Sequence, residues 1–250
     1  MKLEQQIRDI VEKETRDNGA GLLYRTPIVG YADAHDPRYR ELDNLIGNPQ
    51  TLPEEILPGA ETVVVFFLPF SKEALEELKK GRRISQKWSD YYTGTNQLLK
   101  HITGTLAGFL EEQGYPSAQI PPTDDFDLPT LTAKWSHKSS AVIAGIGSFG
   151  LNRLLVTEQG TAGRLGSFVT AAKLEPTSGE DVTYCLYYGK GACRACMDRC
   201  PSGAISKDGF DRFRCNAYLD GKNIHDLQQG CGLCSSGPCA MKGFRERRQP

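Results

Sequence analysis

The stretch Cys193-Arg-Ala-Cys196-Met-Asp-Arg-Cys200-Pro201 decides how this sequence is interpreted. Its spacing matches the last three cysteines of the bacterial ferredoxin run C-x2-C-x2-C-x3-C-P. Lys190 stands where that run has its first cysteine, and Cys185, five residues earlier, is the natural replacement. The spacing therefore predicts a ligand loop for a four-iron cluster.

The remaining cysteines complete a set of eight, which is the number of thiolates that two four-iron clusters require. In two-cluster ferredoxins, the cysteine before the proline is a ligand of the other cluster. On this precedent, one cluster is expected on Cys185, Cys193, Cys196 and Cys239. The other cluster is expected on Cys200, Cys215, Cys231 and Cys234.

Three other uses of the cysteines compete with this prediction. Disulfides are typical of oxidising compartments, and no apolar signal segment follows Met1. A pair of zinc sites would use C-x2-C twice but does not account for the C-x3-C-P triplet. A mixture of free and structural cysteines does not account for eight thiols packed into one end of the chain. Iron–sulfur ligation is therefore the preferred interpretation.

The length of 250 residues allows one large domain or two modest ones. We expect an α/β (α+β) domain over residues 1–178 and a small ferredoxin-like domain over residues 179–250, with a linker at 176–180. The net charge of −1 gives no sign of a protein that coats nucleic acid or a membrane surface. No apolar run reaches transmembrane length, so a cytoplasmic protein without a membrane partner is expected.

Hydrophobic periodicity and turn residues predict the elements of the first domain. Thr62–Leu68 is a run of β-branched and apolar residues typical of a buried strand, and Ser71 can cap a helix that ends at Lys80. Helices are also predicted at residues 2–18, 95–113 and 136–144. Strands are predicted at 152–157 and 166–174, strand or loop at 22–31, and a loop at 115–134.

A glycine run, Gly145-Ile-Gly147-Ser148-Phe149-Gly150, matches the pattern G-x-G-x-x-G. Such a run permits close backbone approach to a ligand, with N–H groups free to donate. Its position in mid-chain, after a predicted helix, is wrong for a Rossmann dinucleotide turn. A purely structural glycine turn stays open as the alternative.

Together these motifs resemble one known family. The stretch Ala144–Asn152, then Gly166-Ser167-Phe168, then the cysteine module are similar to the epoxyqueuosine reductases, which are cobalamin-dependent iron–sulfur reductases related to reductive dehalogenases. Weaker similarity covers Leu57–Val65 and Trp88–Tyr92, so the resemblance extends over roughly residues 50 to 240.

The resemblance implies a nitroreductase-like α/β domain that holds base-off cobalamin against a two-cluster ferredoxin-like domain. Electrons would pass through the two 4Fe–4S clusters to the cobalamin, which would reduce a small substrate. The implied cofactor contacts, made mostly by backbone, are Gly145, Gly147, Ser148, Phe149, Gly150, Asn152, Gly166, Ser167 and Phe168. Tyr91 and Tyr92 are candidate cavity residues, although buried tyrosines are commonly core residues.

The family's general acid is an aspartate in a D-x-x-P segment, and Asp127-Leu-Pro129 is the nearest candidate although its spacing is D-x-P. His137 is the second candidate for proton donation. Its alternative is a structural role in which the ring packs on Trp135 or caps the backbone. Lys138 stands in the region where the family has an acidic residue after the proline.

The family's helical-repeat extension, which helps to hold tRNA, has no counterpart here, so we expect no nucleic-acid partner. The expected partners are an electron donor such as ferredoxin or flavodoxin and a small-molecule substrate. The alternative function is an electron-transfer protein that serves a partner's corrinoid or flavin, or that binds flavin itself. Clusters with a purely structural role are a third possibility.

Overall fold

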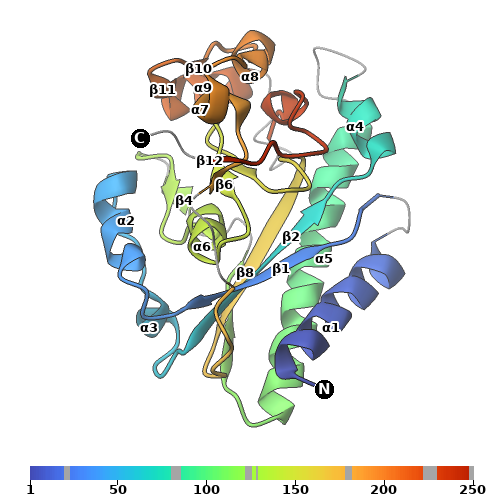
Figure 1. Cartoon of the computed structure of the whole chain (residues 1–250), viewed down its shortest axis with the longest axis vertical. Coiled ribbons are helices and arrows are strands. Elements are labelled where there is room, and N and C mark those ends of the chain that lie inside the picture. Colours follow the sequence, from blue (N-terminus) through green and yellow to red (C-terminus); the bar gives the residue numbers. More distant parts are fainter. Residues whose placement is uncertain are drawn as a thin grey trace. The chain divides into compact units, whose positions relative to one another are not determined.

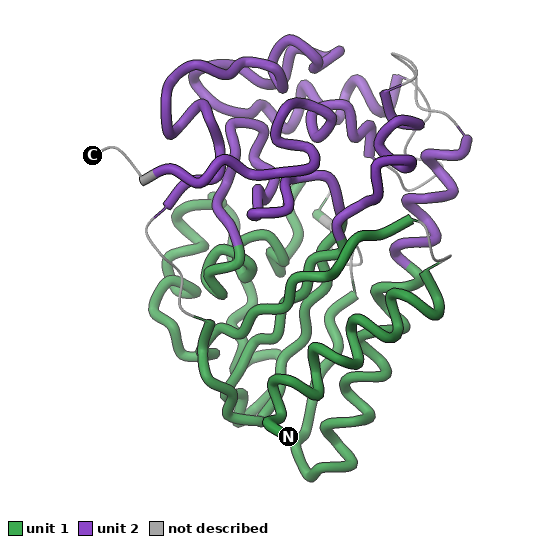
Figure 2. Tube along the Cα trace, turned by 45° about the vertical axis from the view of Figure 1, so that its right-hand side comes forward, with its two compact units in different colours: residues 1–68, 97–146, 164–180 green, residues 69–96, 147–163, 181–250 purple. Residues whose placement is uncertain are grey.

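The structure is a computed structural model that describes residues 1–19, 23–79, 86–121, 126–127, 129–177, 182–221 and 230–247. Helices and strands are mixed along the chain, which confirms the expected mixed α/β class. The chain forms two compact units that are interleaved in sequence (Figure 2). Unit 1 comprises residues 1–68, 97–146 and 164–180, and unit 2 comprises residues 69–96, 147–163 and 181–250.

The predicted division between residues 178 and 179 lies outside the described residues, as does most of the predicted linker. It stays a prediction about domains. The compact unit that contains the cysteines also includes residues 69–96 and 147–163. Local sequence carried no signal for this grouping.

The central sheet of unit 1 has four strands in the order β1-β2-β8-β3. Their bounds are Ile28–Asp33 for β1, Thr62–Pro69 for β2, Gly163–Thr170 for β8 and Ser117–Gln119 for β3. β1 and β2 pair antiparallel, as do β3 and β8. Every residue of β2 is buried, which confirms the predicted strand and fits a strand covered on both faces.

Helices α1 (Leu3–Asn18) and α5 (Gln86–Glu112) supply the core on one face of this sheet (Figure 1). The core cluster joins residues of α1, α5 and alternate positions of β2, among them Ile7, Leu106 and Phe66. α1 confirms the predicted helix at 2–18. The predicted start of α5 at Thr95 is wrong, because the helix already includes residues from Gln86 onward.

The other face of the sheet contacts α6 (His137–Ile143), which also packs against α2 (Arg38–Ile46). The Ser136 side chain caps α6 by accepting a hydrogen bond from the Ser139 N–H, as the predicted helix at 136–144 requires. The short helix α3 (Pro53–Ile56) precedes β2.

The predicted loop at 115–134 is wrong in part. It contains β3 and a small antiparallel pair formed by β4 (Phe126–Asp127) and β5 (Thr132–Ala133). These strands are two or three residues long, too short for an alternating pattern to appear in the sequence. Pairing with a distant strand, not local propensity, makes β3 extended.

Unit 2 is built from short elements. Its described helices are α4 (Lys72–Lys79), α7 (Leu186–Lys190), α8 (Ala195–Arg199), α9 (Arg212–Asp220) and the 3-10 turn η2 (Leu233–Ser235). Its strand pairs are β6 (Ser148–Phe149) with β7 (Leu155–Val156), β9 (Val182–Thr183) with β12 (Glu246–Arg247), and β10 (Ile205–Ser206) with β11 (Gly209–Phe210).

The predicted helix cap at Ser71 and the predicted strand at 152–157 both lie in unit 2. Ser71 caps α4, since its Oγ accepts a hydrogen bond from the Ala74 N–H at 3.3 Å. The strand predicted at 152–157 is shorter than expected, and its partner is β6, which lies inside the glycine run. Among the described residues, no helix is long and apolar enough to cross a membrane.

Candidate iron–sulfur site

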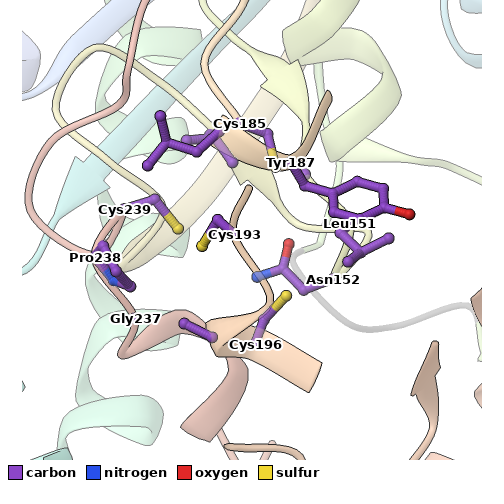
Figure 3. Close-up of a pocket in the computed structure, with 13 residues that line it drawn as sticks. Leu151, Asn152, Cys185, Tyr187, Cys193, Cys196, Gly237, Pro238 and Cys239 are labelled. Atoms are coloured by element: carbon purple, nitrogen blue, oxygen red, sulfur yellow. The ribbon is translucent and has the colours of Figure 1, made fainter. Parts of the chain in front are cut away.

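Four cysteines of unit 2 line one pocket, and they are the four that the ferredoxin precedent assigned to one cluster (Figure 3). Cys185 lies just before α7, Cys193 lies in the turn between α7 and α8, and Cys196 lies in α8. Cys239 comes from a turn more than forty residues further along the chain. Thus tertiary structure brings together thiols that the sequence separates.

The wall of this pocket is largely apolar. Leu151, Val156, Tyr187 and Pro238 line it beside the thiols. Leu151 and Cys185 also belong to a small buried cluster that Ile205 completes. An apolar wall excludes water and lowers the local dielectric constant, both of which affect the potential of a bound redox centre.

The hairpin β6–β7 anchors both sets of cysteines. The Asn152 side chain lines the pocket and donates a hydrogen bond from Nδ2 to the Cys234 carbonyl oxygen at 3.0 Å. Its Oδ1 accepts from the Leu154 N–H at 3.2 Å. The Ser148 Oγ accepts from the Tyr184 N–H at 2.9 Å, next to Cys185. Predicted cofactor residues Ser148 and Asn152 therefore both support the cysteine loops.

Two glycines of the run pack closely within this hairpin. A side-chain carbon on Gly147 would lie 2.6 Å from the Val156 carbonyl oxygen, which is backbone, so this position requires glycine. A side-chain carbon on Gly150 would lie 2.7 Å from the Asn152 Oδ1 and would force the Asn152 side chain to shift. The structural alternative for the glycine run thus has a specific basis, and its role as a cofactor contact stays a prediction for Gly145, Gly147, Phe149 and Gly150.

Electrostatics link the thiols of the first group. Burial raises the pKa of Cys196 to about 11, and the neighbouring Cys185 and Cys193 add to the rise. Burial likewise raises the pKa of Cys239 to about 12, with contributions from the other three thiols. The thiols of Cys185 and Cys193 therefore lie close enough to Cys196 and Cys239 to raise the pKa values of those two groups.

The second predicted group shows the same mutual effect. Burial raises the pKa of Cys215 to about 11, followed by the charges of Cys200 and Cys231. Burial raises the pKa of Cys234 to about 12, and the other members of its group are the next largest causes. Because thiolates are the ligands, binding of iron to either group must release protons.

Cys200 differs from the other cysteines. Burial acts to raise its pKa, but hydrogen bonds from the Ser202 hydroxyl and from nearby backbone N–H groups outweigh burial and lower it. The Cys200 Sγ and Ser202 Oγ are 3.3 Å apart. This thiol, which precedes Pro201, is therefore prepared for the charged form that a metal requires.

The eight cysteines are all free in the structure, so no disulfide competes for them. Within the described part of the chain, no three ligand side chains converge closely enough for a single metal ion. A four-iron cluster does not need such convergence, because each thiolate binds a different iron of the cube.

Trp88 is a supporting residue whose contact the sequence did not indicate. Its indole N–H donates to the Gly230 carbonyl oxygen at 3.2 Å, directly before Cys231. Its ring packs edge-on against Phe70 at a centroid distance of 5.5 Å. Tyr91 and Tyr92, in the part of α5 that belongs to unit 2, are half-buried, and their role as cavity residues stays a prediction.

Asp127 is exposed in unit 1, and its carboxylate accepts hydrogen bonds from both the N–H and the hydroxyl of Thr130. These bonds lower the pKa of Asp127 below its usual value. A general acid near neutral pH benefits from a raised pKa. Asp127 would therefore have to leave Thr130 before it could act as the predicted proton donor.

His137 belongs to a closed hydrogen-bond network. Its Nε2 lies 3.2 Å from the Pro121 carbonyl oxygen, which can only accept, so Nε2 carries the proton. Its Nδ1 then accepts from the Ser167 hydroxyl at 2.6 Å, and that hydroxyl accepts from the Trp135 indole N–H at 3.0 Å. Part of the residue is exposed, but burial of the ring lowers the pKa of His137 to about 4.

This network supports the structural alternative for His137, because the imidazole is neutral near pH 7 and both nitrogens are engaged. Ser167 and Phe168, in β8, have no exposed surface, so any cofactor contact from them would use the backbone. A side-chain carbon on Gly166 would lie 2.5 Å from the Phe66 ring. Three predicted cofactor residues thus have established packing roles in unit 1.

The fold and the pocket lined by four thiols define a cysteine-rich protein of mixed α/β class. Comparison with known proteins confirms the resemblance to epoxyqueuosine reductases. The chain is 27% identical over 217 residues to an epoxyqueuosine reductase from Lactococcus garvieae, with 79% of this chain and 57% of that protein covered. A relative from Cyclobacterium marinum is also 27% identical, with 67% and 50% covered. The chain therefore spans about half the length of the curated relatives it matches.

Solved structures agree at the level of fold. The epoxyqueuosine reductase of Streptococcus thermophilus superposes with a TM-score of 0.62 at 19% identity, covering 100% of this chain and 70% of that one. An epoxyqueuosine reductase solved with an epoxyqueuosine-modified tRNA stem loop has a TM-score of 0.60 at 19% identity, covering 97% and 68%. A catabolic reductive dehalogenase has a TM-score of 0.53 at 18% identity, covering 76% and 27%. No family model matches the chain.

Proposed function

We propose that this chain is an iron–sulfur oxidoreductase that holds two 4Fe–4S clusters and delivers their electrons to cobalamin for reduction of a small substrate. The observation that carries the proposal is the pocket shared by Cys185, Cys193, Cys196 and Cys239. The mutual pKa effects of the second group, centred on Cys215 and Cys234, support a second cluster. Four thiolates per cluster are the usual requirement.

The likeness to epoxyqueuosine reductases supports the oxidoreductase class and the choice of cofactors. Iron–sulfur clusters would supply single electrons at low potential, and cobalamin would supply a cobalt centre that they can reduce. In this proposal the first domain is nitroreductase-like and the second is ferredoxin-like.

The chain's own residues would hold and insulate these groups. The thiolates would bind iron, and Leu151, Val156 and Tyr187 would keep water from one cluster. Asn152, which lines the pocket, would hold the Cys234 segment in place through its hydrogen bond to the Cys234 carbonyl oxygen. Asp127, once released from Thr130, is the proposed proton donor, since the neutral His137 is fully engaged.

An electron donor such as ferredoxin or flavodoxin and a small-molecule substrate complete the proposal. The expectation against a nucleic-acid partner is weakened, because one structural neighbour was solved with a tRNA stem loop. A binding measurement with a modified tRNA stem loop therefore belongs beside the screen of small substrates.

The first experiment is anaerobic reconstitution with iron, sulfide and hydroxocobalamin, followed by gel filtration, iron analysis and absorbance spectra. We expect about eight irons per chain and one comigrating corrinoid. Eight irons without corrinoid would remove the cobalamin step. The chain would then transfer electrons to a partner or use flavin, and a flavin titration would follow.

Two substitutions test the ligand groups separately. Cys196→Ser and Cys200→Ser should each reduce the iron content to about half, because each removes one ligand of a different cluster. The remaining cluster should have a different electron paramagnetic resonance (EPR) spectrum in the two variants. Met197→Leu, next to Cys196, is the control and should keep full iron. A Cys196→Ser protein with full iron and unchanged spectra would refute the assignment.

A further inference from the structure

The hydroxyl of Thr161 is buried and has no hydrogen-bond partner in the described part of the chain. Only 4% of the residue is exposed. The large majority of buried hydroxyls are hydrogen-bonded, because an unsatisfied buried donor loses the bonds that it makes to water in the unfolded chain. The described residues therefore supply no partner for this hydroxyl.

The backbone fixes Thr161 beside Cys239. Its N–H donates to the Cys239 carbonyl oxygen at 2.9 Å, and the next N–H, of Ala162, donates to the Ala240 carbonyl oxygen at 3.1 Å. Two consecutive bonds of this kind form a short ladder between the segments. Thr161 cannot move away from the Cys239 turn without breaking both.

The turn before Thr161 is equally constrained. Gly160 has a φ of 90°, and a side-chain carbon there would lie 2.4 Å from the Ala240 carbonyl oxygen, so only glycine allows this close approach. The Thr157 hydroxyl donates to the Gly160 carbonyl oxygen at 2.9 Å. The nearby hydroxyl of Thr157 is thus satisfied by the protein, in contrast to that of Thr161.

Cys239 is one of the four thiols that line the cysteine pocket. A 4Fe–4S cluster in that pocket would make the Cys239 thiolate and the sulfides next to it acceptors beside the turn to which Thr161 is hydrogen-bonded through its backbone. Hydrogen bonds to cluster sulfurs raise the reduction potential, since the reduced cluster carries more negative charge.

We propose that Thr161 tunes the cluster held by Cys185, Cys193, Cys196 and Cys239 by donating a hydrogen bond from Oγ1 to a sulfur at the Cys239 corner. The inference rests on the proposed function, because it needs that cluster. It makes Thr161 a tuning residue and not a ligand. The hydroxyl that lacks a partner in the protein would gain one from the cluster.

The test compares Thr161→Val, which removes the hydroxyl and keeps the branched shape, with Thr161→Ser, which keeps the hydroxyl. Both full-length variants are reconstituted anaerobically and titrated electrochemically under EPR. We expect Thr161→Val to lower one of the two cluster potentials, up to the ~59 mV that corresponds to a tenfold change for one electron. The other potential should not move, and Thr161→Ser should match the wild type.

Two further measurements make the outcome decisive. Deuterium hyperfine spectra after exchange into heavy water should lose one coupled deuteron in Thr161→Val. Thr103→Val, which alters a buried threonine of unit 1 that bonds to the Leu99 carbonyl oxygen, should change neither potential.

Different failures have different meanings. Wild-type chain that binds no iron would refute the proposed clusters. Wild-type chain with both clusters, but with potentials and deuteron couplings identical to those of Thr161→Val, would refute only the role of Thr161. Equal shifts in Thr161→Ser and Thr161→Val would also refute it, because the hydroxyl would then not be the cause.

Discussion

The two compact units bury different kinds of groups. Unit 1 has an apolar core in which Ile7, Phe66, Leu106 and Phe168 are fully buried. The cysteine-bearing part of unit 2 has a small buried cluster of Leu151, Cys185 and Ile205, around which further thiols pack. Helices α8 and α9 contain no buried residue at all.

This difference separates two sources of stability. Burial of apolar surface contributes roughly 25 cal/mol per Å² to stability, and unit 1 buries a larger set of apolar side chains than the small cluster around Cys185. Small segments with little apolar core commonly depend on metal centres or cross-links. If the proposed clusters are bound, we expect residues 182–221 and 230–247 to depend on them for order, whereas unit 1 should not.

The largest predicted effect is that of iron removal. A structural metal centre contributes on the order of 10 kcal/mol in small metal-binding domains. Chelation under oxidising conditions should therefore increase proteolytic cleavage within residues 182–247 by at least ~10-fold, because cleavage follows the population of the open form. Cleavage within residues 1–68 should stay unchanged. Limited proteolysis with mass spectrometry measures both.

A mock treatment without chelator is the control. Equal protection of residues 182–247 in the iron-free and iron-loaded chain would contradict the comparison. It would mean that the thiol-rich segments fold without their clusters, and the short elements of unit 2 would need another source of stability.

A core substitution in unit 1 should have the reverse effect. Leu106→Ala removes a fully buried side chain of α5 and should lower the free energy of unfolding by about 2–5 kcal/mol. Iron content in native buffer should not change. Denaturant titration followed by circular dichroism, with iron analysis, tests both statements. Leu45→Ala is the control, because Leu45 is 75% exposed and should change stability by less than about 0.5 kcal/mol.

The smallest predicted effect concerns pH and is confined to unit 1. Because burial lowers the pKa of His137 to about 4, below the unfolded value of about 6.5, the unfolded chain binds the proton first as pH falls. The stability that the neutral ring contributes is complete above pH 6.5 and is lost between about pH 6.5 and 4. The loss should be about 2 kcal/mol after allowance for partial exposure.

NMR titration of the His137 ring measures its pKa directly. His137→Gln should reduce the fall in unfolding free energy between pH 7 and 5, whereas Lys134→Gln, an exposed neighbour, should keep the wild-type fall. A His137 pKa near 6.5 would show that the ring is solvated. In that case its network with Ser167 and Pro121 would not be closed, and a role in proton donation would regain support.

Elements with a strong local pattern were predicted well. β2 is a run of eight buried residues, and α1 follows the 3.6-residue period. α6 lies within the predicted helix at 136–144, and Ser71 caps α4 as predicted. By contrast, β3 and the pair β4–β5 have too few residues for a pattern, and the first turns of α5 lack the apolar period that marks its later part.

The cysteines of the candidate site could be predicted because their spacing is a property of short segments of sequence. C-x2-C and C-x3-C-P spacing identified the thiols and their two groups, and the pocket contains the predicted first group. Supporting contacts were not predictable. Trp88 to Gly230 and Tyr184 to Ser148 join segments far apart in sequence, and nothing in either segment indicates its partner.

The sequence by itself determined the eight thiols, the mixed α/β class and the resemblance to epoxyqueuosine reductases, because spacing and periodicity are properties of short segments. The division of the thiols into two cluster groups stays a prediction. Tertiary structure alone decided that residues 69–96 and 147–163 join the cysteine-bearing segments in unit 2. It also decided that the glycine run forms a hairpin and that Thr161 has a buried hydroxyl without a partner. These features depend on backbone hydrogen bonds and close approach between distant segments, which only the folded chain brings together.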